Sequence, residues 1–405
     1  MNLGSADPRP RVALAFSGGL DTRWCIPKLL DSGYEIVTVT VDVTGDGQAD
    51  ATAFAELSKQ LGAIDHVHID ASNAYYADTL RLLIAGNVLR GGTYPLCVGA
   101  ERNLQAQEVA RVAVAKGCEA VAHGCTAAGN DQVRFEITLR SVASELNVIA
   151  PVRDLAPSRA EQIEDLEKLG YPVPEKAQYS VNAGLWGVTI GGKETTGTAE
   201  SIPESQWLWT RNAFDHPMPS RLIKIGFRDG TPVALDGDEL EPVICITELN
   251  TLGGSYGIGR GIHLGETILG IKGRVAFEAP AATILIAAHR ELEKLVLTKR
   301  QIQAKDAVSA MYGDWIHEGL ACDPACRDIE SLLTSSQQRV TGEVAVRLRT
   351  GSFMVEGVQS PYSLHAASRA VYGEAVGEWT PAEALGFSRL FGLSSVLHAR
   401  AGEKA

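Results

Sequence analysis

Near the start of the chain, a short apolar run ends in residues 17–22, which read SGGLDT. The apolar run predicts a strand, and the pattern after these six residues predicts a helix. Small residues let successive backbone N–H groups converge on an anion, and a helix start adds the positive end of its dipole. Residues 17–22 therefore predict a phosphate-binding turn, although a turn without a ligand could have the same composition. It is not the G-x-x-x-x-G-K-[ST] loop, because no lysine follows the glycines.

A second group of chemistry-bearing residues lies within 122–136, which read AHGCTAAGNDQVRFE. Thr126, Asn130, Asp131 and Arg134 offer a hydroxyl, an amide, a carboxylate and a guanidinium group. Asn130 and Arg134 are four residues apart, so on a helix they share a face. The alternative is a capped helix start in which Arg134 makes a surface ion pair. That alternative is favoured for this cluster alone, whereas the two clusters together favour a functional site.

Short β-rich runs alternate with helical segments in the first third of the chain, which predicts a parallel sheet covered on both faces. The predicted strands are 12–16, 35–41, 66–69, 120–123 and 147–150, and the predicted helices are 53–61, 77–84 and 102–116. Ligands in such sheets bind at the carboxyl ends of the strands. Residues 17–22, Asp42 and residues 123–134 are therefore expected to share one rim.

The pattern changes from about Pro151, where a group of prolines brackets a short predicted helix (159–169) and indicates a linker. A hairpin is expected around Asp229-Gly230, because this pair is a strong turn signal between two β-rich runs. Further expected elements are short strands within 265–277, a helix at 280–297, strands at 343–349 and 352–358, and a C-terminal segment (381–400) that wraps a neighbouring subunit.

The composition is typical of a globular protein, with 45% hydrophobic and 21% charged residues among 405. A formal net charge of −12 argues against nucleic acid as a main partner. No apolar stretch is long enough to span a membrane, and the first residues lack the apolar core of a signal peptide. The seven scattered cysteines are interpreted as reduced thiols, so a cytoplasmic protein is expected. Cys322 and Cys326 have no histidine partners, and no metal site is expected there.

The two clusters together resemble the argininosuccinate synthase family, whose patterns are close to AYSGGLDTS and HGCTGKGNDQVRFE. Segments with counterparts in the same order include TYPL (93–96), YSVNAGLWG (179–187), GIGR (257–260) and FEAPAATIL (277–285). The resemblance implies an α/β protein with an N-terminal parallel-sheet ATP-pyrophosphatase domain of the adenine nucleotide alpha hydrolase type (1–165). An α+β synthetase domain (166–375) and a C-terminal oligomerisation segment (376–405) of a homotetramer are expected to follow.

The family's reaction uses ATP with Mg²⁺ to adenylate the ureido oxygen of citrulline, after which the amine of L-aspartate displaces AMP. By resemblance, the ATP-binding residues are Ala15, Phe16, Ser17, Gly18, Gly19, Leu20, Asp21, Thr22, Val41, Gly124 and Cys125. Those for aspartate are Thr126, Asn130 and Asp131. Those for the acceptor are Tyr94, Gly99, Arg102, Asn130, Arg134, Ser180, Thr189, Glu266 and Phe277. Asp21, Asp131 and Arg134 are expected to be catalytic, and no residue stands out as a general base.

The departures from the family pattern gather in the acceptor pocket. Gly99 stands where the family has a serine that contacts citrulline, and Phe277 replaces a tyrosine. Gly265 stands where the family has a glutamate that helps to hold the α-amino group, with Glu266 one place late. The other departures are Thr189 for a serine, Ala127 and Ala128 for Gly and Lys, and Arg23 for a serine.

Three hypotheses follow from these departures. The chain is a working argininosuccinate synthase of arginine biosynthesis that has drifted, with Glu266 shifted by a local bulge to do the missing work. Alternatively, it is a paralogue that uses ATP and aspartate with another ureido or carbamoyl acceptor of specialised metabolism. We favour this second hypothesis, because losing one buried polar contact costs roughly 1–3 kcal/mol and three contacts to one ligand are lost. A catalytically weak nucleotide-binding regulatory subunit is the third.

Overall fold

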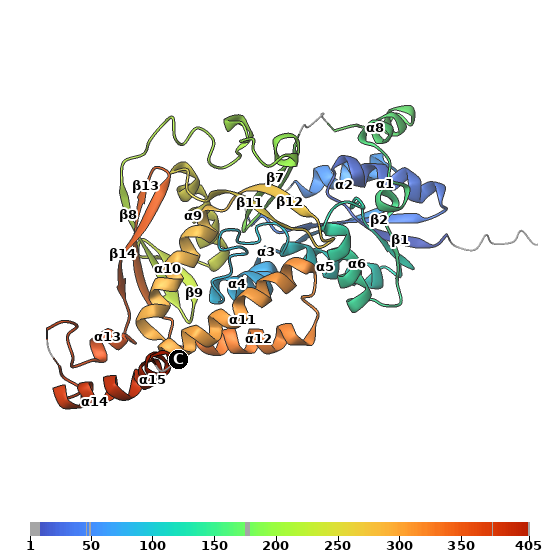
Figure 1. Cartoon of the computed structure of the whole chain (residues 1–405). Coiled ribbons are helices and arrows are strands. Elements are labelled where there is room, and N and C mark those ends of the chain that lie inside the picture. Colours follow the sequence, from blue (N-terminus) through green and yellow to red (C-terminus); the bar gives the residue numbers. More distant parts are fainter. Residues whose placement is uncertain (1–8, 46, 48–49, 175–178, 375, 404–405) are drawn as a thin grey trace, which may run out of the picture.

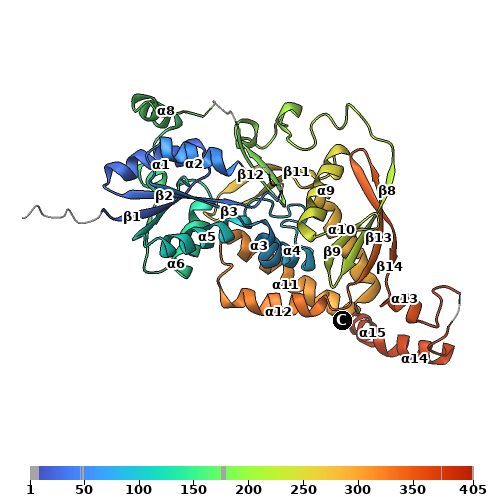
Figure 2. The same ribbon diagram turned by 180° about the vertical axis from the view of Figure 1, so that it is seen from behind.

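The structure, a computed structural model, describes residues 9–45, 47, 50–174, 179–374 and 376–403. A parallel-sheet domain forms one end of the molecule and two antiparallel sheets with long helices form the rest (Figures 1 and 2). Within the described residues, no helix is both long and apolar enough to cross a membrane.

The N-terminal sheet has the strand order β3-β2-β1-β4-β5, and every neighbouring pair is parallel. This confirms the predicted parallel sheet, and each of the five predicted strands is present to within about one residue at either end. The strands are β1 (Arg11–Ala15), β2 (Glu35–Asp42), β3 (Asp65–Asp70), β4 (Ala120–Ala122) and β5 (Asn147–Ile149).

Alternating side chains of the strands enter two separate hydrophobic cores, which explains why helices cover both faces. Val12 and Leu14 of β1 enter one core, and Ala13 enters the other. The first core packs against α1 (Leu20–Asp31), α2 (Ala51–Gln60), α7 (Pro151–Leu155) and α8 (Arg159–Lys168). The second packs against α5 (Glu101–Ala115) and α6 (Asp131–Val142).

The predicted hairpin around Asp229-Gly230 is confirmed and belongs to an antiparallel sheet of order β10-β9-β8-β13-β14. The predicted strands at 343–349 and 352–358 and the predicted helix at 280–297 are also present. The strands of the sheet are β8 (Arg221–Arg228), β9 (Thr231–Leu235), β10 (Asp238–Glu239), β13 (Gly342–Arg349) and β14 (Ser352–Gln359). Helices α9 (Pro242–Ser255) and α10 (Pro280–Val296) pack against it.

A second antiparallel sheet, of order β11-β12-β7-β6, lies between the two larger parts of the molecule. Its strands are β6 (Ser180–Gly184), β7 (Gly187–Gly191), β11 (Arg260–Glu266) and β12 (Lys272–Glu278). On one face Val188, Ile190 and Ala276 pack against Ile202 and Trp207 of the following loop. That loop contains the 3₁₀ turns η2 (Lys193–Thr196) and η3 (Glu204–Gln206). The other face is free to line a site.

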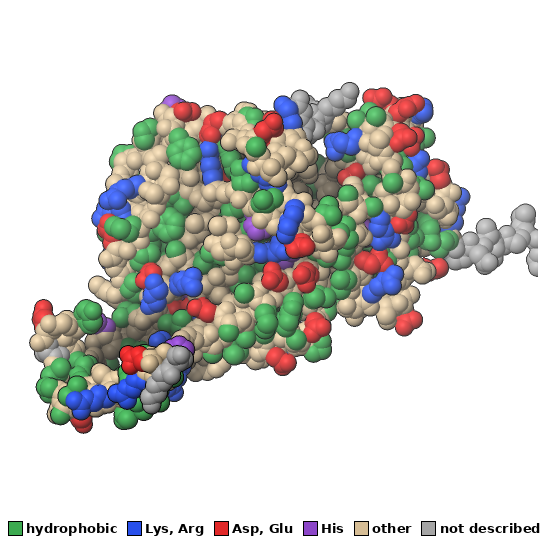
Figure 3. Space-filling model, in the orientation of Figure 1, with side chains coloured by type: hydrophobic (Ala, Val, Ile, Leu, Met, Phe, Trp, Pro, Cys, Tyr) green, Lys and Arg blue, Asp and Glu red, His purple; other side chains and the backbone are tan. Residues whose placement is uncertain are grey.

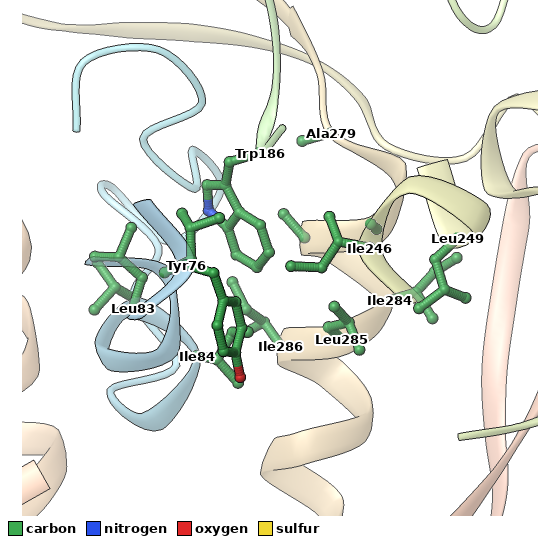
Figure 4. Close-up of a cluster of buried hydrophobic side chains, with 14 of the residues drawn as sticks. Tyr76, Leu83, Ile84, Trp186, Ile246, Leu249, Ala279, Ile284, Leu285 and Ile286 are labelled. Atoms are coloured by element: carbon green, nitrogen blue, oxygen red, sulfur yellow. The ribbon is translucent and has the colours of Figure 1, made fainter. Parts of the chain in front are cut away.

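The largest hydrophobic core joins residues 71–104 to residues 185–348 (Figure 4). Tyr76 and Leu83 lie on the earlier segment, and Trp186 and Ile246 come from the later one. The earlier segment holds α3 (Ser72–Tyr75), a π-helical turn η1 (Tyr76–Leu80) and α4 (Arg81–Ala85), where one helix was predicted over 77–84. This core contains residues from both sides of residue 165, where a domain boundary was predicted. The boundary therefore stays a prediction.

Helices α11 (Lys299–Glu318) and α12 (Pro324–Ser336), like α9, had no counterpart among the expected elements. Helix α11 begins at a capping box in which the Thr298 hydroxyl accepts from the Gln301 N–H. Its sequence alternates polar and apolar residues irregularly, so the apolar stripe that identifies a surface helix is weak.

The last helices, α13 (Leu364–Ala367), α14 (Pro381–Phe391) and α15 (Leu393–Gly402), form an arm that projects from the body (Figures 1 and 3). The C-terminal segment expected at 381–400 forms two helices, and its contact with a neighbouring subunit stays a prediction. Large apolar side chains remain exposed along it, including Phe387, Leu390 and Phe391.

A fully buried ion pair ties four elements together beneath the large core. The Lys305 ammonium lies 2.9 Å from Glu293, and both side chains are almost completely buried. Glu293 also accepts from Asn87 (2.6 Å) and Gln337 (3.0 Å), and the His289 ring bridges these two amides. Because these buried groups depend on one another rather than on water, removal of one leaves the others without compensation.

We expect Glu293→Gln to lower the free energy of unfolding by about 3–5 kcal/mol, because the Lys305 charge stays buried without a counter-ion. Urea unfolding measures the loss. Arg290→Gln on the same helix is the control: its ion pair with Asp306 is exposed and 3.6 Å long, so the loss stays below about 1 kcal/mol. Equal losses in the two variants would contradict the assignment.

Candidate functional site

The predicted phosphate-binding turn forms the junction between β1 and α1. Gly18 has φ +68°, a conformation that glycine adopts freely, and a Cβ there would lie 3.1 Å from the Phe54 ring. Gly19 is the N-cap residue of α1, so backbone N–H groups at the helix start remain available to an anion. The Thr22 hydroxyl donates to the Gly19 carbonyl (3.2 Å) and lies 3.4 Å from the Ser17 hydroxyl.

The loop after β4 approaches this turn closely. A Cβ on Gly124 would lie 3.1–3.2 Å from atoms of Asp21 and Thr22, so glycine lets the two backbones meet. The strand order reverses between β1 and β4, since the chain adds β2 and β3 on one side and β5 on the other. Such a switch point is where open α/β sheets bind their ligands. The turn and the loop after β4 therefore share one rim, as expected.

Three side chains brace the turn from outside. Gln162 on α8 donates to the Asp21 carboxylate at 2.8 Å. Arg23 donates to the carbonyls of Gly18 (2.7 Å) and Pro172 (3.0 Å), and it links the turn to the segment that leaves the domain. Burial lowers the pKa of Arg23. Phe54 of α2 packs against Gly18 of the turn and makes an edge-on contact with the Phe16 ring. No role was predicted for Phe54 from the sequence.

The expected aspartate and acceptor residues meet in a charge cluster at the start of α6. Asp131 accepts from Arg102 of α5 (3.0 Å) through one oxygen and from Arg134 (2.6 Å) through the other. Burial by itself would raise the pKa of Asp131. The opposite charges and hydrogen bonds of the two guanidinium groups outweigh this effect and lower the pKa to about 2. Asp131 is therefore a fixed anion at physiological pH, and a poor general base.

Arg134 is held in place by residues far away in the chain. It donates to the His317 carbonyl (2.7 Å) at the end of α11 and lies 3.1 Å from the ring Nδ1. Burial and the cations Arg134 and Arg90 lower the pKa of His317 to about 2, so its ring is neutral. A Cβ on Gly99 would lie 3.0 Å from the Arg134 guanidinium, so residue 99 directly adjoins this cation.

The free face of the second antiparallel sheet lies against this cluster. Phe277, Thr189 and Asn182 are in register on β12, β7 and β6, so they share one face. Asn182 accepts from Arg102 (3.3 Å), and Phe277 packs edge-on against the buried Tyr94 ring at 5.2 Å. The face therefore joins the expected acceptor residues to the charge cluster, and Ser180 lies two residues along β6 from Asn182.

The structure does not bring the Glu266 carboxylate to this face. Strands β11 and β12 pair without a register shift from Arg260 to Glu266, so the strand holds no bulge. Alternation then puts Glu266 on the side opposite His263 and Gly265. Its exposed carboxylate pairs with Lys272 at 3.3 Å. The hypothesis of a local bulge that moves Glu266 into place is therefore not supported by the geometry.

The remaining expected residues line the edges of the site. Asn130 accepts from the Ile268 N–H (2.9 Å) and so ties the β11–β12 turn to the N-terminal domain. Thr126 is exposed on the loop after β4, and Cys125 is half-buried beside it. Ala15 and Val41 lie at the ends of β1 and β2 that point toward the turn.

Glu101 is a buried carboxylic acid that the sequence did not single out. One oxygen accepts from Arg102 (2.8 Å), whereas the other has no hydrogen-bond partner among the described residues. Burial raises the pKa of Glu101 to about 8, with Arg102 opposing this rise and Asp131 adding to it. A Cβ on Gly184 would lie 2.2 Å from that second oxygen, so the glycine makes room for the acid. The pair is distant in sequence, and only the fold reveals it.

Among the described residues, no group of three or more His, Cys, Asp or Glu could hold a metal ion. The free cysteines include Cys322 and Cys326, of which Cys326 donates to the Leu320 carbonyl at 3.3 Å.

A phosphate turn at the switch point of a parallel sheet, with no P-loop lysine, defines a nucleotide-binding domain of the ATP-pyrophosphatase type. The family model described as the arginosuccinate synthase N-terminal HUP domain matches residues 11–172, and that of the C-terminal domain matches residues 179–398. The chain belongs to the argininosuccinate synthase family, and it is an ATP-dependent C–N ligase.

Relatives named argininosuccinate synthase cover nearly the whole chain. The protein from Methanocaldococcus jannaschii is 39% identical over 96% of this chain and 98% of its own. The protein from Methanothermobacter thermautotrophicus is 41% identical over 88% of this chain and 89% of its own. The protein from Xanthomonas campestris is 37% identical over 96% of this chain and 98% of its own.

We expect Gly18→Ala to weaken ATP binding about tenfold, because the left-handed backbone costs roughly 1–2 kcal/mol and the methyl group meets Phe54. Calorimetric titration with ATP measures the affinity. Gly33→Ala is matched, since Gly33 has φ +88° but no atom within 4 Å of its Cβ, and it lies away from the turn. This control loses stability and keeps its ATP affinity. Unchanged binding in Gly18→Ala would contradict the assigned turn.

We expect the free energy of unfolding to fall less steeply between pH 5 and 8 in Glu101→Gln than in the unmodified protein. With a pKa of about 8, the folded protein binds more protons than the unfolded chain above the ordinary glutamate pKa. Stability from this group is thus greatest in acid and falls as pH rises, by at most about 1.4 kcal/mol per pH unit. Urea unfolding across this range measures the difference from the unmodified protein. Glu108→Gln, also on α5 and near the surface beside Arg111, should leave the slope unchanged.

Proposed function

We propose that the protein adenylates a ureido or carbamoyl acceptor other than citrulline and condenses it with L-aspartate, forming AMP and pyrophosphate. The relatives' name supports the aspartate-dependent ligation. The changed acceptor is supported by one observation above all: the sheet face that meets Tyr94 has no carboxylate at position 265, and the Glu266 carboxylate lies on the opposite side.

In this proposal, ATP is cleaved at the turn formed by residues 17–22. The acceptor oxygen attacks the α-phosphate, the bond between the α and β phosphates breaks, and pyrophosphate leaves with both electrons of that bond. Backbone N–H groups of the turn and the start of α1 meet the developing negative charge. Asp21 offers an oxygen ligand of the type that Mg²⁺ prefers, and a bound Mg²⁺ would neutralise charge on the leaving pyrophosphate.

In this proposal, aspartate is joined to the activated acceptor at the charge cluster of Asp131, Arg102 and Arg134. After its ammonium form gives a proton to solvent, the aspartate amine attacks the activated carbon and the new C–N bond forms. The C–O bond to the activated carbon breaks, AMP leaves with the oxygen and both electrons of that bond, and the attacking nitrogen gives a second proton to solvent. Asp131 stays ionised and attracts the ammonium form of the incoming aspartate, and Arg134 and Arg102 attract carboxylates. Thr126 and Asn130 flank this point on the same loop. Close alignment of two bound substrates is worth roughly 7–11 kcal/mol in such reactions.

The acceptor pocket supports a changed ligand. Gly99 and Phe277 offer no hydroxyl to a bound acceptor, and Gly99 lies directly beside the Arg134 guanidinium, where a serine side chain would face the acceptor. A genuine synthase with drifted residues is the alternative, and the intact turn and charge cluster are compatible with it. A nucleotide-binding regulatory subunit is the alternative from another class, and those same intact features argue against it.

Pyrophosphate release tests the proposal. The protein is assayed with ATP, L-aspartate and either citrulline or one of a set of ureido and carbamoyl acids, beside the Methanocaldococcus jannaschii synthase as control. We expect citrulline turnover at least about 100-fold less efficient than in the control, since each lost polar contact costs roughly 1–3 kcal/mol. Efficiency equal to the control would overturn the changed acceptor. Binding of ATP without pyrophosphate release from any acceptor would favour the regulatory role.

We further propose that the C-terminal arm holds a homotetramer together. Its exposed apolar side chains include Phe391, which is 78% exposed, and a second copy of the chain would cover them. The resemblance to the family supports the tetramer, and the projection of α14 and α15 from the body supports an exchanged arm (Figure 3).

Leu390→Asp should therefore weaken the assembly, because burying one leucine is worth about 1.5–3 kcal/mol and a charge replaces it. We expect at least a tenfold rise in the dissociation constant, measured by light scattering over a dilution series. Leu155→Asp, at an exposed leucine on α7, is the control and should leave the mass unchanged. A monomeric unmodified protein would refute the proposal.

A further inference from the structure

His263 lies in the middle of β11, on the same side of the strand as Gly261 and Gly265. Its ring stacks on the Tyr94 ring, with 5.2 Å between centroids and 19° between planes. Tyr94 in turn packs against Phe277, so the imidazole belongs to the same face as the expected acceptor residues. No role was predicted for His263 from its sequence context.

Two glycines make room for this imidazole. A Cβ on Gly91 would lie 3.2 Å from the ring Cε1, and a Cβ on Gly265 would lie 2.4 Å from Nε2. Real Cβ atoms do not approach that closely, so His263 occupies the volume that a side chain at 265 would enter. The imidazole and a glutamate at 265 therefore exclude each other in this arrangement.

The Nε2 atom of His263 is buried, and it has no hydrogen-bond partner within the part of the chain that the structure describes. A buried polar atom without a partner is costly, and a ligand that satisfies it recovers that cost. The ring is flanked by Arg90, which pairs with Asp314, and by neutral His317. Burial, with a smaller contribution from Arg90, lowers the pKa of His263, so the ring is neutral at physiological pH.

Resting on the proposed function, we infer that His263 is a specificity-determining residue whose Nε2–H donates to an oxygen of the acceptor. The nearby Arg90 and Arg134 guanidinium groups favour a carboxylate, carbonyl or hydroxyl oxygen there and disfavour an ammonium group. The acceptor class is thus a ureido or carbamoyl acid that has no ammonium group where it meets Tyr94 and His263.

Citrulline and 5-ureidopentanoate form a matched pair for the test, because the second is citrulline without its α-ammonium group. Calorimetric titration in the presence of α,β-methylene-ATP measures binding of each without turnover. We expect the unmodified protein to bind 5-ureidopentanoate at least about tenfold more tightly than citrulline, which corresponds to about 1.4 kcal/mol. Tighter binding of citrulline, or no binding of either compound, would overturn the inference.

Variants assign the preference to the imidazole. His263→Ala should weaken 5-ureidopentanoate binding at least about tenfold, whereas His263→Gln, which keeps an N–H donor, should restore most of it. The double variant His263→Ala with Gly265→Glu should reverse the preference toward citrulline. Leu264→Ala, on the exposed side of the same strand, is the control for the strand itself. Equal affinities in the alanine variant and the unmodified protein would refute a role for His263.

Pyrophosphate release separates this inference from the proposed function. Binding of 5-ureidopentanoate that depends on His263, without pyrophosphate formation from ATP and aspartate, would support the residue's role in binding and contradict the proposed reaction. Pyrophosphate release with citrulline at ordinary efficiency would contradict both. Pyrophosphate release with another ureido acid, unaffected by His263→Ala, would leave the reaction in place and overturn the inference.

Discussion

The site depends on one shared carboxylate. Asp131 lies between Arg102 and Arg134, and without it two guanidinium groups would face each other in a largely buried place. Arg102 extends from this carboxylate to Asn182 of β6, and Arg134 extends to His317 of α11. One anion at the start of α6 thereby positions elements from both halves of the chain. Its low pKa keeps that arrangement intact over the whole physiological range.

The parallel sheet could be predicted because its signals are local. Each strand of the first domain is a short β-rich run bounded by a turn or a helix with its own pattern, and β1, β2 and β4 are largely buried by their neighbours. Helices α9 and α11 had no such periodic signal, whereas α12 carries one that was overlooked: Asp323 caps the helix, and Cys326, Ile329 and Leu333 form its buried stripe. Helix α9 is rich in β-branched residues, and α11 is polar along most of its length, so tertiary packing decides both.

The same distinction applies to the site. Residues 17–22 and 124–134 were identifiable because their functional groups follow one another in the chain. The roles of Glu266 and His263 depend instead on strand register, since a shift of one residue exchanges the two faces. Glu101 and Gly184 fit each other across a long sequence separation, and Phe54 reaches the phosphate turn from another helix. Such relations exist only in the folded chain.

The core that joins residues 71–104 to residues 185–348 also constrains how the protein comes to be folded. During synthesis, the first strands can pair early, but the segment from α3 to α4 must wait for α10 and α12, far later in the chain, before its apolar side chains are covered. Until then it exposes hydrophobic surface on a nascent chain, which is the state that invites aggregation and chaperone binding. The two halves are thus interdependent in assembly as well as in catalysis.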